Sequence, residues 1–205
     1  MRGRKACYNV SPFVARAGLE MKLRFVVYLF MFAFAAGALA HDNWARSSRE
    51  SAKLAPPPEE ERDAVVQAYA ARVWGWRGLF ADHTWISVKP RNADAYTVYE
   101  VVGWRLRRGL PALRIAEDIP DRHWFGKRPR LLADVRGEKA RTAAAEVARA
   151  AAEYPWPDEY RAFPGPNSNT FTAWIARRVP QLGLKLPWRA VGKGFVRRAE
   201  KNADA

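Results

Sequence analysis

A serine and a histidine stand where a nucleophile and its base could stand. Ser168 lies between two asparagines and follows the turn sequence FPGP, which predicts that it begins a helix. His83 begins the alternating run HTWISVK, which is typical of a β-strand. A hydroxyl at a helix start attacks an acyl carbonyl when an imidazole removes its proton. The pair is compatible with a hydrolytic site, and also with a capped helix and an ordinary histidine in a sheet.

A carboxylate could complete the set. Alternation along strand 83–89 places His83 and Trp85 on one side and the more apolar residues, which suit the core, on the other. Glu100 is the only acidic residue in the next predicted strand, 96–104. If the strand register brings Glu100 to His83, its carboxylate would orient the imidazole, as the third member of a catalytic triad does.

The residues around Ser168 have a structural interpretation as well. Asparagine, serine and threonine are the preferred N-cap residues, so Asn167, Ser168 and Asn169 could serve only to cap helix 168–178. A serine hydroxyl is too weak an acid for a helix dipole to ionise, so catalysis would need a base such as His83.

A groove is expected beside the serine and the histidine. The proline-rich loop 154–166 carries four aromatic residues, Tyr160 among them. Together with Trp85, Asn167 and Asn169, Tyr160 is predicted to line this groove. The catalytic interpretation requires the groove to be open.

The elements that would hold these residues predict an α+β fold. Their patterns indicate an antiparallel sheet of about four strands packed against helices. The predicted helices are 59–74, 137–154 and 168–178, and the predicted strands are 83–89, 96–104, 112–116 and 130–135. The apolar stripe of the last helix includes Trp174 and is expected to face the sheet.

The first forty residues predict export. Residues 1–20 resemble an over-extended start, and residues 21–40 combine a basic flank, an apolar run and an Ala-Leu-Ala end. This pattern is typical of a signal peptide or an N-terminal membrane anchor, which places the rest in the periplasm or at the inner membrane. A linker is predicted over 41–58, a single domain over 59–195 and a polar tail over 196–205.

Composition narrows the chemistry further. Cys7 is the only cysteine, so the exported part has neither a disulfide nor a thiol nucleophile. The three histidines lack the spacing of a metal site, and no cofactor is expected. His123 is expected at the surface of a loop.

The charge favours anionic partners. The chain carries a formal charge of +14, and residues 1–40 hold six basic residues and one acidic residue, which leaves 29 basic and 20 acidic residues beyond them. An exported protein with this excess suits lipid head groups or cell-wall polymers rather than nucleic acid. The oligomeric state does not follow from the sequence.

Four stretches carry a family resemblance: GWRGLFADHTWISVKP, YTVYEVVGWRLRRG, ADVRG and YRAFPGPNSNTFTAWIARRVPQLGLKLP. Over roughly residues 60–195 the chain resembles the bacterial domain of unknown function 3750. More remotely, the order of strand histidine, polar residue and Asn-X-Asn-x-Phe helix start resembles circularly permuted papain-like domains of the NlpC and lecithin:retinol acyltransferase types.

In those domains the X position is the catalytic cysteine, which Ser168 replaces. The resemblance implies the histidine role for His83 and the third polar role for Glu100. Because a hydroxyl is far less nucleophilic than a thiolate, we expect a non-catalytic envelope module with a degenerate peptidase-like groove. The alternative is a serine-dependent amidase, peptidase or acyl hydrolase acting on cell-wall peptides or lipids.

Overall fold

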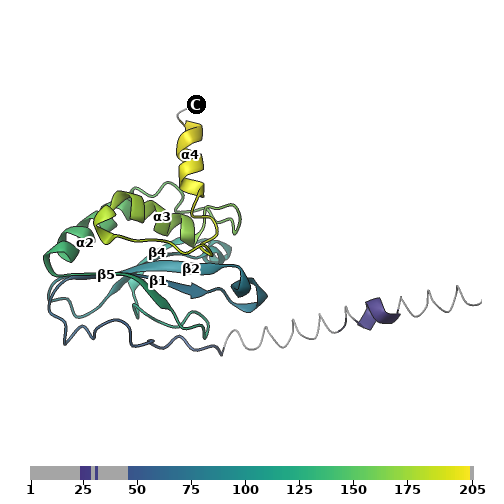
Figure 1. The fold of residues 1–205 in the computed structure, drawn as a ribbon, viewed down its shortest axis with the longest axis horizontal. Coiled ribbons are helices and arrows are strands. Elements are labelled where there is room, and N and C mark those ends of the chain that lie inside the picture. Colours follow the sequence, from purple (N-terminus) through teal and green to yellow (C-terminus); the bar gives the residue numbers. More distant parts are fainter. Residues whose placement is uncertain (1–23, 29–30, 32–45, 204–205) are drawn as a thin grey trace, which may run out of the picture. The chain divides into compact units, whose positions relative to one another are not determined.

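The computed structural model describes residues 24–28, 31 and 46–203 of the chain. The chain divides into two compact units, Met1–Arg46 and Ser47–Ala205. The second unit contains the sheet and its covering layers (Figure 1).

A five-stranded sheet forms the centre of this unit, one strand more than predicted. Its order is β4-β3-β2-β1-β5, and every neighbouring pair is antiparallel. Short connections therefore join β1 to β2, β2 to β3 and β3 to β4, as in a meander. The strands are β1 (Val65–Arg72), β2 (Asp82–Lys89), β3 (Thr97–Val101), β4 (Leu113–Glu117) and β5 (Arg130–Arg136).

The additional strand corrects a prediction: residues 59–74 do not form a helix, and β1 occupies Val65–Arg72 instead. β1 pairs with β2 on one side and β5 on the other, and all of its residues except Arg72 are buried. A strand buried on both faces is a continuous apolar run, which contains helical spacings by chance. The apolar residues at 65, 69 and 73 therefore satisfied a helical pattern without forming a helix.

Two helices cover one face of the sheet. They are α2 (Gly137–Ala152) and α3 (Ser168–Arg178), close to the predicted 137–154 and 168–178. Both lie on the same side of the sheet in Figure 1. Ile86 and Val88 of β2 pack into the cluster that holds Phe171, Trp174 and Ile175 of α3, so the predicted apolar stripe of the last helix does face the sheet.

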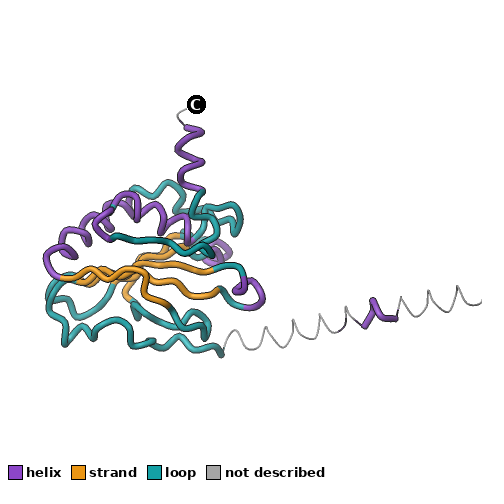
Figure 2. Tube along the Cα trace, in the orientation of Figure 1, coloured by secondary structure: helices purple, strands orange, loops and turns teal. Residues whose placement is uncertain are grey.

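The opposite face is covered by irregular chain rather than by helices, drawn as teal loops in Figure 2. Tyr69, Trp85 and Val98 of the sheet form a second cluster there with Trp124 and Phe125. Within the predicted linker 41–58, residues 51–55 are bound to this cover. The Asp121 carboxylate accepts hydrogen bonds from the Ser51 hydroxyl and from the amides of Leu54 and Ala55.

Two short 3-10 turns occupy the same end of the sheet. The turn η1 (Gly75–Leu79) joins β1 to β2, and η2 (Gly103–Arg108) joins β3 to β4. Because neighbouring strands are antiparallel, these connections meet at one end, on the right in Figure 2. The predicted strand 96–104 therefore ends at Val101 and continues into η2.

The C-terminal part adds two helical segments, η3 (Pro180–Leu182) and α4 (Phe195–Ala203). Residues 195–203 were predicted as the end of the domain and a polar tail. Val196 is fully buried in the cluster that also holds Phe171 and Trp174 of α3, so the beginning of α4 belongs to the core.

The predicted signal peptide or anchor, residues 21–40, lies mostly outside the described residues. Of this segment, residues 24–28 and 31 are described, and they are helical. None of the helices in the described part of the chain is long and apolar enough to cross a membrane.

Candidate functional site

Helix α3 begins with a capping box. The Asn167 side-chain oxygen accepts hydrogen bonds from the amides of Asn169 (3.0 Å) and Thr170 (3.1 Å), and the Thr170 hydroxyl accepts one from the Asn167 amide (3.1 Å). This reciprocal arrangement satisfies the free amides of a first helical turn. Asn167 is therefore the cap, and Ser168 is the first helical residue.

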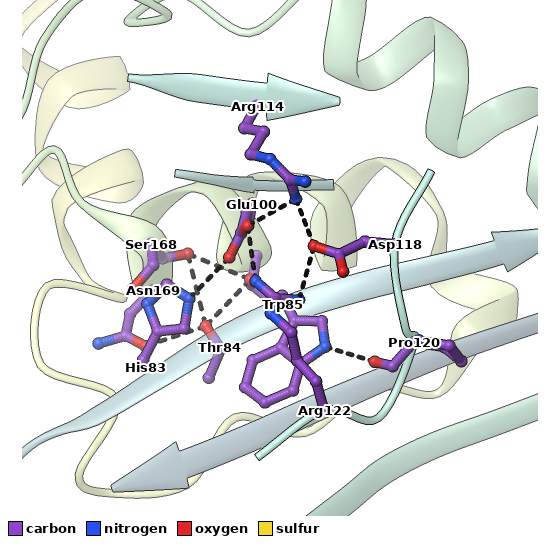
Figure 3. Close-up of polar contacts among 11 residues, drawn as sticks. His83, Thr84, Trp85, Glu100, Arg114, Asp118, Pro120, Arg122, Ser168 and Asn169 are labelled. Carbon is purple, nitrogen blue, oxygen red and sulfur yellow. Dashed lines mark hydrogen bonds and ion pairs between the residues drawn. The ribbon is translucent and has the colours of Figure 1, made fainter. Parts of the chain in front are cut away.

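The first turn of α3 is fastened to the beginning of β2. The side-chain nitrogen of Asn169 donates to the backbone carbonyl of Asp82 (2.9 Å), and its side-chain oxygen accepts a hydrogen bond from the Thr84 hydroxyl (2.9 Å). Asn169 thus binds the residues on both sides of His83 in the chain. The labelled side chains of this region are shown in Figure 3. Asn169 therefore sets where Ser168 stands relative to the strand that carries His83.

His83 and Glu100 meet on the sheet. Thr84 binds α3, so the alternation of a strand turns His83 toward the other face. There, His83 Nε2 lies 3.3 Å from Glu100 Oε2. The contact between His83 and Glu100, which the sequence left dependent on the strand register, is therefore present (Figure 3).

Two arginines, which sequence reasoning did not identify, complete this network. Glu100 Oε1 accepts hydrogen bonds from Arg122 Nη2 at 2.7 Å and from Arg114 Nη1 at 3.0 Å. Arg114 Nη1 also lies 2.8 Å from Asp118 Oδ2. Arg114 follows Glu100 by one hairpin, and Arg122 comes from the aromatic, basic loop after β4. Nothing local in their sequence distinguishes them from the many other arginines of the chain.

Aromatic rings close the site. The imidazole of His83 stacks on Trp124 with ring centres 3.6 Å apart and an angle of 11° between the planes. Trp85 lies 5.7 Å from the imidazole on another side. His83 consequently exposes 4% of its surface, and Glu100 exposes 2%. Trp85 is fully buried, with its indole N–H donating to the Pro120 carbonyl, so it does not line an open groove.

The network is electrostatically balanced without a charge on His83. Two carboxylates, Glu100 and Asp118, face two guanidinium groups, Arg114 and Arg122. Burial lowers the pKa of His83, and the Arg122 charge adds to this effect against the attraction of Glu100. Burial alone would raise the pKa of Glu100, but the hydrogen bond with His83 and the two arginines lower it to about 2. The site therefore holds a neutral imidazole and an ionised carboxylate at neutral pH.

The tautomer follows from this assignment. A neutral His83 donates its Nε2 proton to the Glu100 carboxylate, which leaves Nδ1 as an unprotonated acceptor. Among the described residues, neither His83 Nδ1 nor the Ser168 hydroxyl has a hydrogen-bond partner, and no hydrogen bond joins the two. The arrangement contains a base with a free lone pair and a free hydroxyl, on two residues that each expose only 4% of their surface.

The His83 pKa predicts a stability change in mild acid. The unfolded chain takes up a proton on His83 near pH 6.5, whereas the folded chain does so only at lower pH. The free energy of unfolding is then at its full value, as far as His83 is concerned, above pH 6.5. It falls as the pH drops below 6.5, by at most about 1.4 kcal/mol per pH unit. Urea unfolding between pH 7 and pH 5 measures this slope.

Replacing His83 by glutamine should flatten the slope, because the amide does not titrate. His123→Gln is the matched control, since His123 is half-buried in a loop and its Nδ1 lies 2.9 Å from the Glu50 carbonyl. A His83→Gln protein that keeps the full slope would assign it to other groups. Below pH 4.5 the protonation of Glu100 should add a further loss.

Tyr160 and Asn167, the remaining predicted site residues, make other contacts. Tyr160 is half-exposed, and its ring packs directly on Gly103 of η2. The Asn167 side-chain nitrogen donates to the carbonyls of Ala162 and Val191, so this residue organises loops rather than a binding surface. In the described ranges no group of three or more histidine, cysteine or acidic residues is arranged to hold a metal ion.

Comparison with known proteins gives one match. No curated protein and no solved structure matches the chain. The model of one family, "Protein of unknown function (DUF3750)", matches residues 63–195. This range contains the sheet, α2 and α3, and with them His83, Glu100 and Ser168. Since the match extends over more than half of the chain, the protein belongs to the DUF3750 family.

Proposed function

We propose that the protein is an exported envelope module whose peptidase-like site is non-catalytic. The enclosure of His83 carries this proposal. Its ring is stacked on Trp124, its Nε2 is bound to Glu100, and only 4% of its surface is exposed. A general base must reach the proton that it removes in a substrate complex. An imidazole held in this way acts as a polar centre of the fold.

Export and partners rest on the sequence. Residues 21–40 have the flank, apolar run and small-residue end of a signal peptide or anchor. The protein would then lie in the periplasm or be anchored to the inner membrane. Its excess of basic residues suits lipid head groups or cell-wall polymers.

A second candidate, a serine-dependent amidase, peptidase or acyl hydrolase, is favoured by the unused hydrogen-bonding atoms. In such a reaction the Ser168 oxygen bonds to the acyl carbon, its proton moves to His83 Nδ1, and the leaving group later departs with that proton. Glu100 would stabilise the imidazolium. Water then hydrolyses the acyl-serine. The amides of Asn169 and Thr170 are already bound to Asn167, which leaves the Ser168 amide to bind an oxyanion.

A fluorophosphonate probe on the purified, exported protein separates the two candidates. Under our proposal Ser168 remains unlabelled, because its hydroxyl lacks an accessible base. The hydrolase predicts labelling that disappears in both Ser168→Ala and His83→Gln. Mass spectrometry of the same preparation reads the N-terminus, which should lie near His41 or retain residues 21–40. A soluble cytosolic protein that begins at Met1 would contradict export.

A cysteine variant gives the complementary result. In a Cys7→Ser background, Ser168→Cys should react with iodoacetamide more slowly than the control Ala152→Cys, at an exposed position of α2. If His83 is a working base, the same thiol should instead react faster at neutral pH, because an imidazole partner favours the thiolate. His83→Gln would then remove the acceleration. Fast, His83-dependent alkylation would overturn the non-catalytic assignment.

A further inference from the structure

Four separate segments meet at the end of the sheet where η1 and η2 lie. They are residues 75–80, 103–110, 160–163 and 188–193, and together we call them the rim. The Asp82 amide, next to the first segment, donates to the Arg189 carbonyl in the last at 3.0 Å. The Tyr160 ring packs so closely on Gly103 that a Cβ there would lie 2.4 Å from it. The Asn167 side-chain nitrogen donates to the carbonyls of Ala162 and Val191, which joins the third segment to the fourth. These contacts connect the four segments into one rim.

The rim exposes large apolar side chains. Phe163 exposes 77% of its surface, and Trp76 and Trp188 each expose 72%. Smaller but substantial fractions are exposed on six further rim residues. These are Leu79, Phe80, Trp104, Leu106, Leu110 and Tyr160. Single exposed apolar residues are ordinary on a soluble protein, but a gathered set of this kind marks a contact surface.

Basic side chains are interleaved with these apolar ones, and the four rim segments contain no acidic residue. The basic residues are Arg77, Arg105, Arg107, Arg108, Arg161, Arg189 and Lys193. Asp158 and Glu159 precede the third segment, so the positive charge is concentrated on η2. Arg107 and Arg108 are both exposed there.

We propose that the rim docks the protein onto the surface of an anionic phospholipid bilayer. Tryptophan, tyrosine and arginine share an apolar body and a polar end, which suits the boundary between head groups and acyl chains. The charge is complementary, since anionic lipids attract each basic side chain near the surface. This inference goes beyond the proposed function, because it holds whether or not Ser168 is catalytic.

The opposite end of the sheet provides an internal control. It carries a pocket of about 790 Å³ lined by Pro56, Tyr96, Asp118 and Asp121, among others. Ile119 lies at this pocket and is exposed. Two carboxylates and one basic residue, Lys53, line this pocket, so anionic lipids should favour it less than the rim, whose four segments contain no acidic residue.

A fluorescent probe at each end tests the orientation directly. In a full-length Cys7→Ser chain, Leu79→Cys or Ile119→Cys is labelled with an environment-sensitive dye and mixed with phosphatidylglycerol-containing vesicles. The dye at 79 should shift to shorter wavelength and be quenched by lipids with a nitroxide near the head group. The dye at 119 should not respond. Because both proteins retain residues 21–40, membrane insertion of that segment cannot produce the difference.

Charge variants test the lipid chemistry. Arg107→Ser with Arg108→Ser should weaken the response at 79 about 30-fold in apparent affinity, since each basic residue contributes roughly fivefold. The matched control, Arg91→Ser with Lys139→Ser, removes the same charge from exposed positions at the other end of the sheet. Trp76→Ser with Phe163→Ser should weaken docking without removing charge. Circular dichroism checks that each variant is folded.

Three results would overturn the proposal. One is an equal response of the dyes at 79 and 119, and another is an unchanged affinity in the η2 double variant. The third is a response at 79 that follows protein concentration or a soluble polyanion but not vesicles. That last result would make the rim a contact between copies of the chain or a polymer site. Serine-probe labelling is read separately, so the outcomes for docking and catalysis remain distinguishable.

Discussion

Glu100→Ala is expected to lower the free energy of unfolding by about 3–5 kcal/mol, the usual cost of breaking a buried ion pair from one side. The carboxylate is 2% exposed and accepts hydrogen bonds from Arg122 and Arg114 while contacting His83. Removing it leaves the buried Arg122 guanidinium with the longer 3.6 Å contact to Asp118 as its remaining ion pair. An uncompensated charge in this setting costs far more than the lost hydrogen bonds alone.

Chemical denaturation of the variant measures this loss, which corresponds to a fall of roughly 10 °C in the thermal midpoint. Glu138→Gln is the matched control, because Glu138 also binds an arginine, Arg141, but at the exposed start of α2. Surface ion pairs of this type contribute little, so the control should unfold almost like the parent. Similar midpoints for the two variants would show that Glu100 is dispensable to the fold.

Trp174→Ala is expected to cost about 3–5 kcal/mol as well, by creating a cavity under α3. The side chain is buried, and its ring packs edge-to-face against Tyr154 and Trp156. Its indole N–H donates to the Ala150 carbonyl at 2.7 Å. Since Ala150 lies in the last turn of α2, where carbonyls lack helical partners, this bond ties the two helices together.

Two further variants separate packing from hydrogen bonding at this position. Trp174→Phe keeps most of the bulk but leaves the Ala150 carbonyl unpaired, which should cost about 1–3 kcal/mol. Trp76→Ala, at a highly exposed site on η1, should stay within about 0.5 kcal/mol of the parent. A loss below about 1 kcal/mol for Trp174→Ala would mean that the α2–α3 contact contributes little to stability.

Local sequence patterns were sufficient to predict a helix or strand wherever its formation depends on residues within that element alone. The alternation in residues 83–89 predicted β2, and the asparagines after FPGP predicted the start of α3. Capping and strand alternation depend on a few neighbouring residues, so a single sequence displays them. The alanine-rich α2 followed from intrinsic propensity in the same way. The family resemblance, predicted over roughly residues 60–195, was also confirmed by the match to DUF3750 over residues 63–195.

Other features depended on parts of the chain that meet only after folding. β1 was mistaken for a helix because burial on both faces, which removes the alternation, is a property of the sheet. The contact between His83 and Glu100 required the register of β2 against β3, which the sequence left open. Arg122 and Trp124, which neutralise and close the site, reach it from a loop.

What the sequence determined by itself was therefore a set of elements, the residue types available for chemistry, and a positive charge. Only the tertiary structure decided that Thr84 faces α3 while His83 faces Trp124. The same holds for the meeting of four distant segments at one end of the sheet. The physical reason is that hydrogen-bond geometry acts between neighbours along the chain, whereas burial and charge pairing are set by residues that are neighbours only in space.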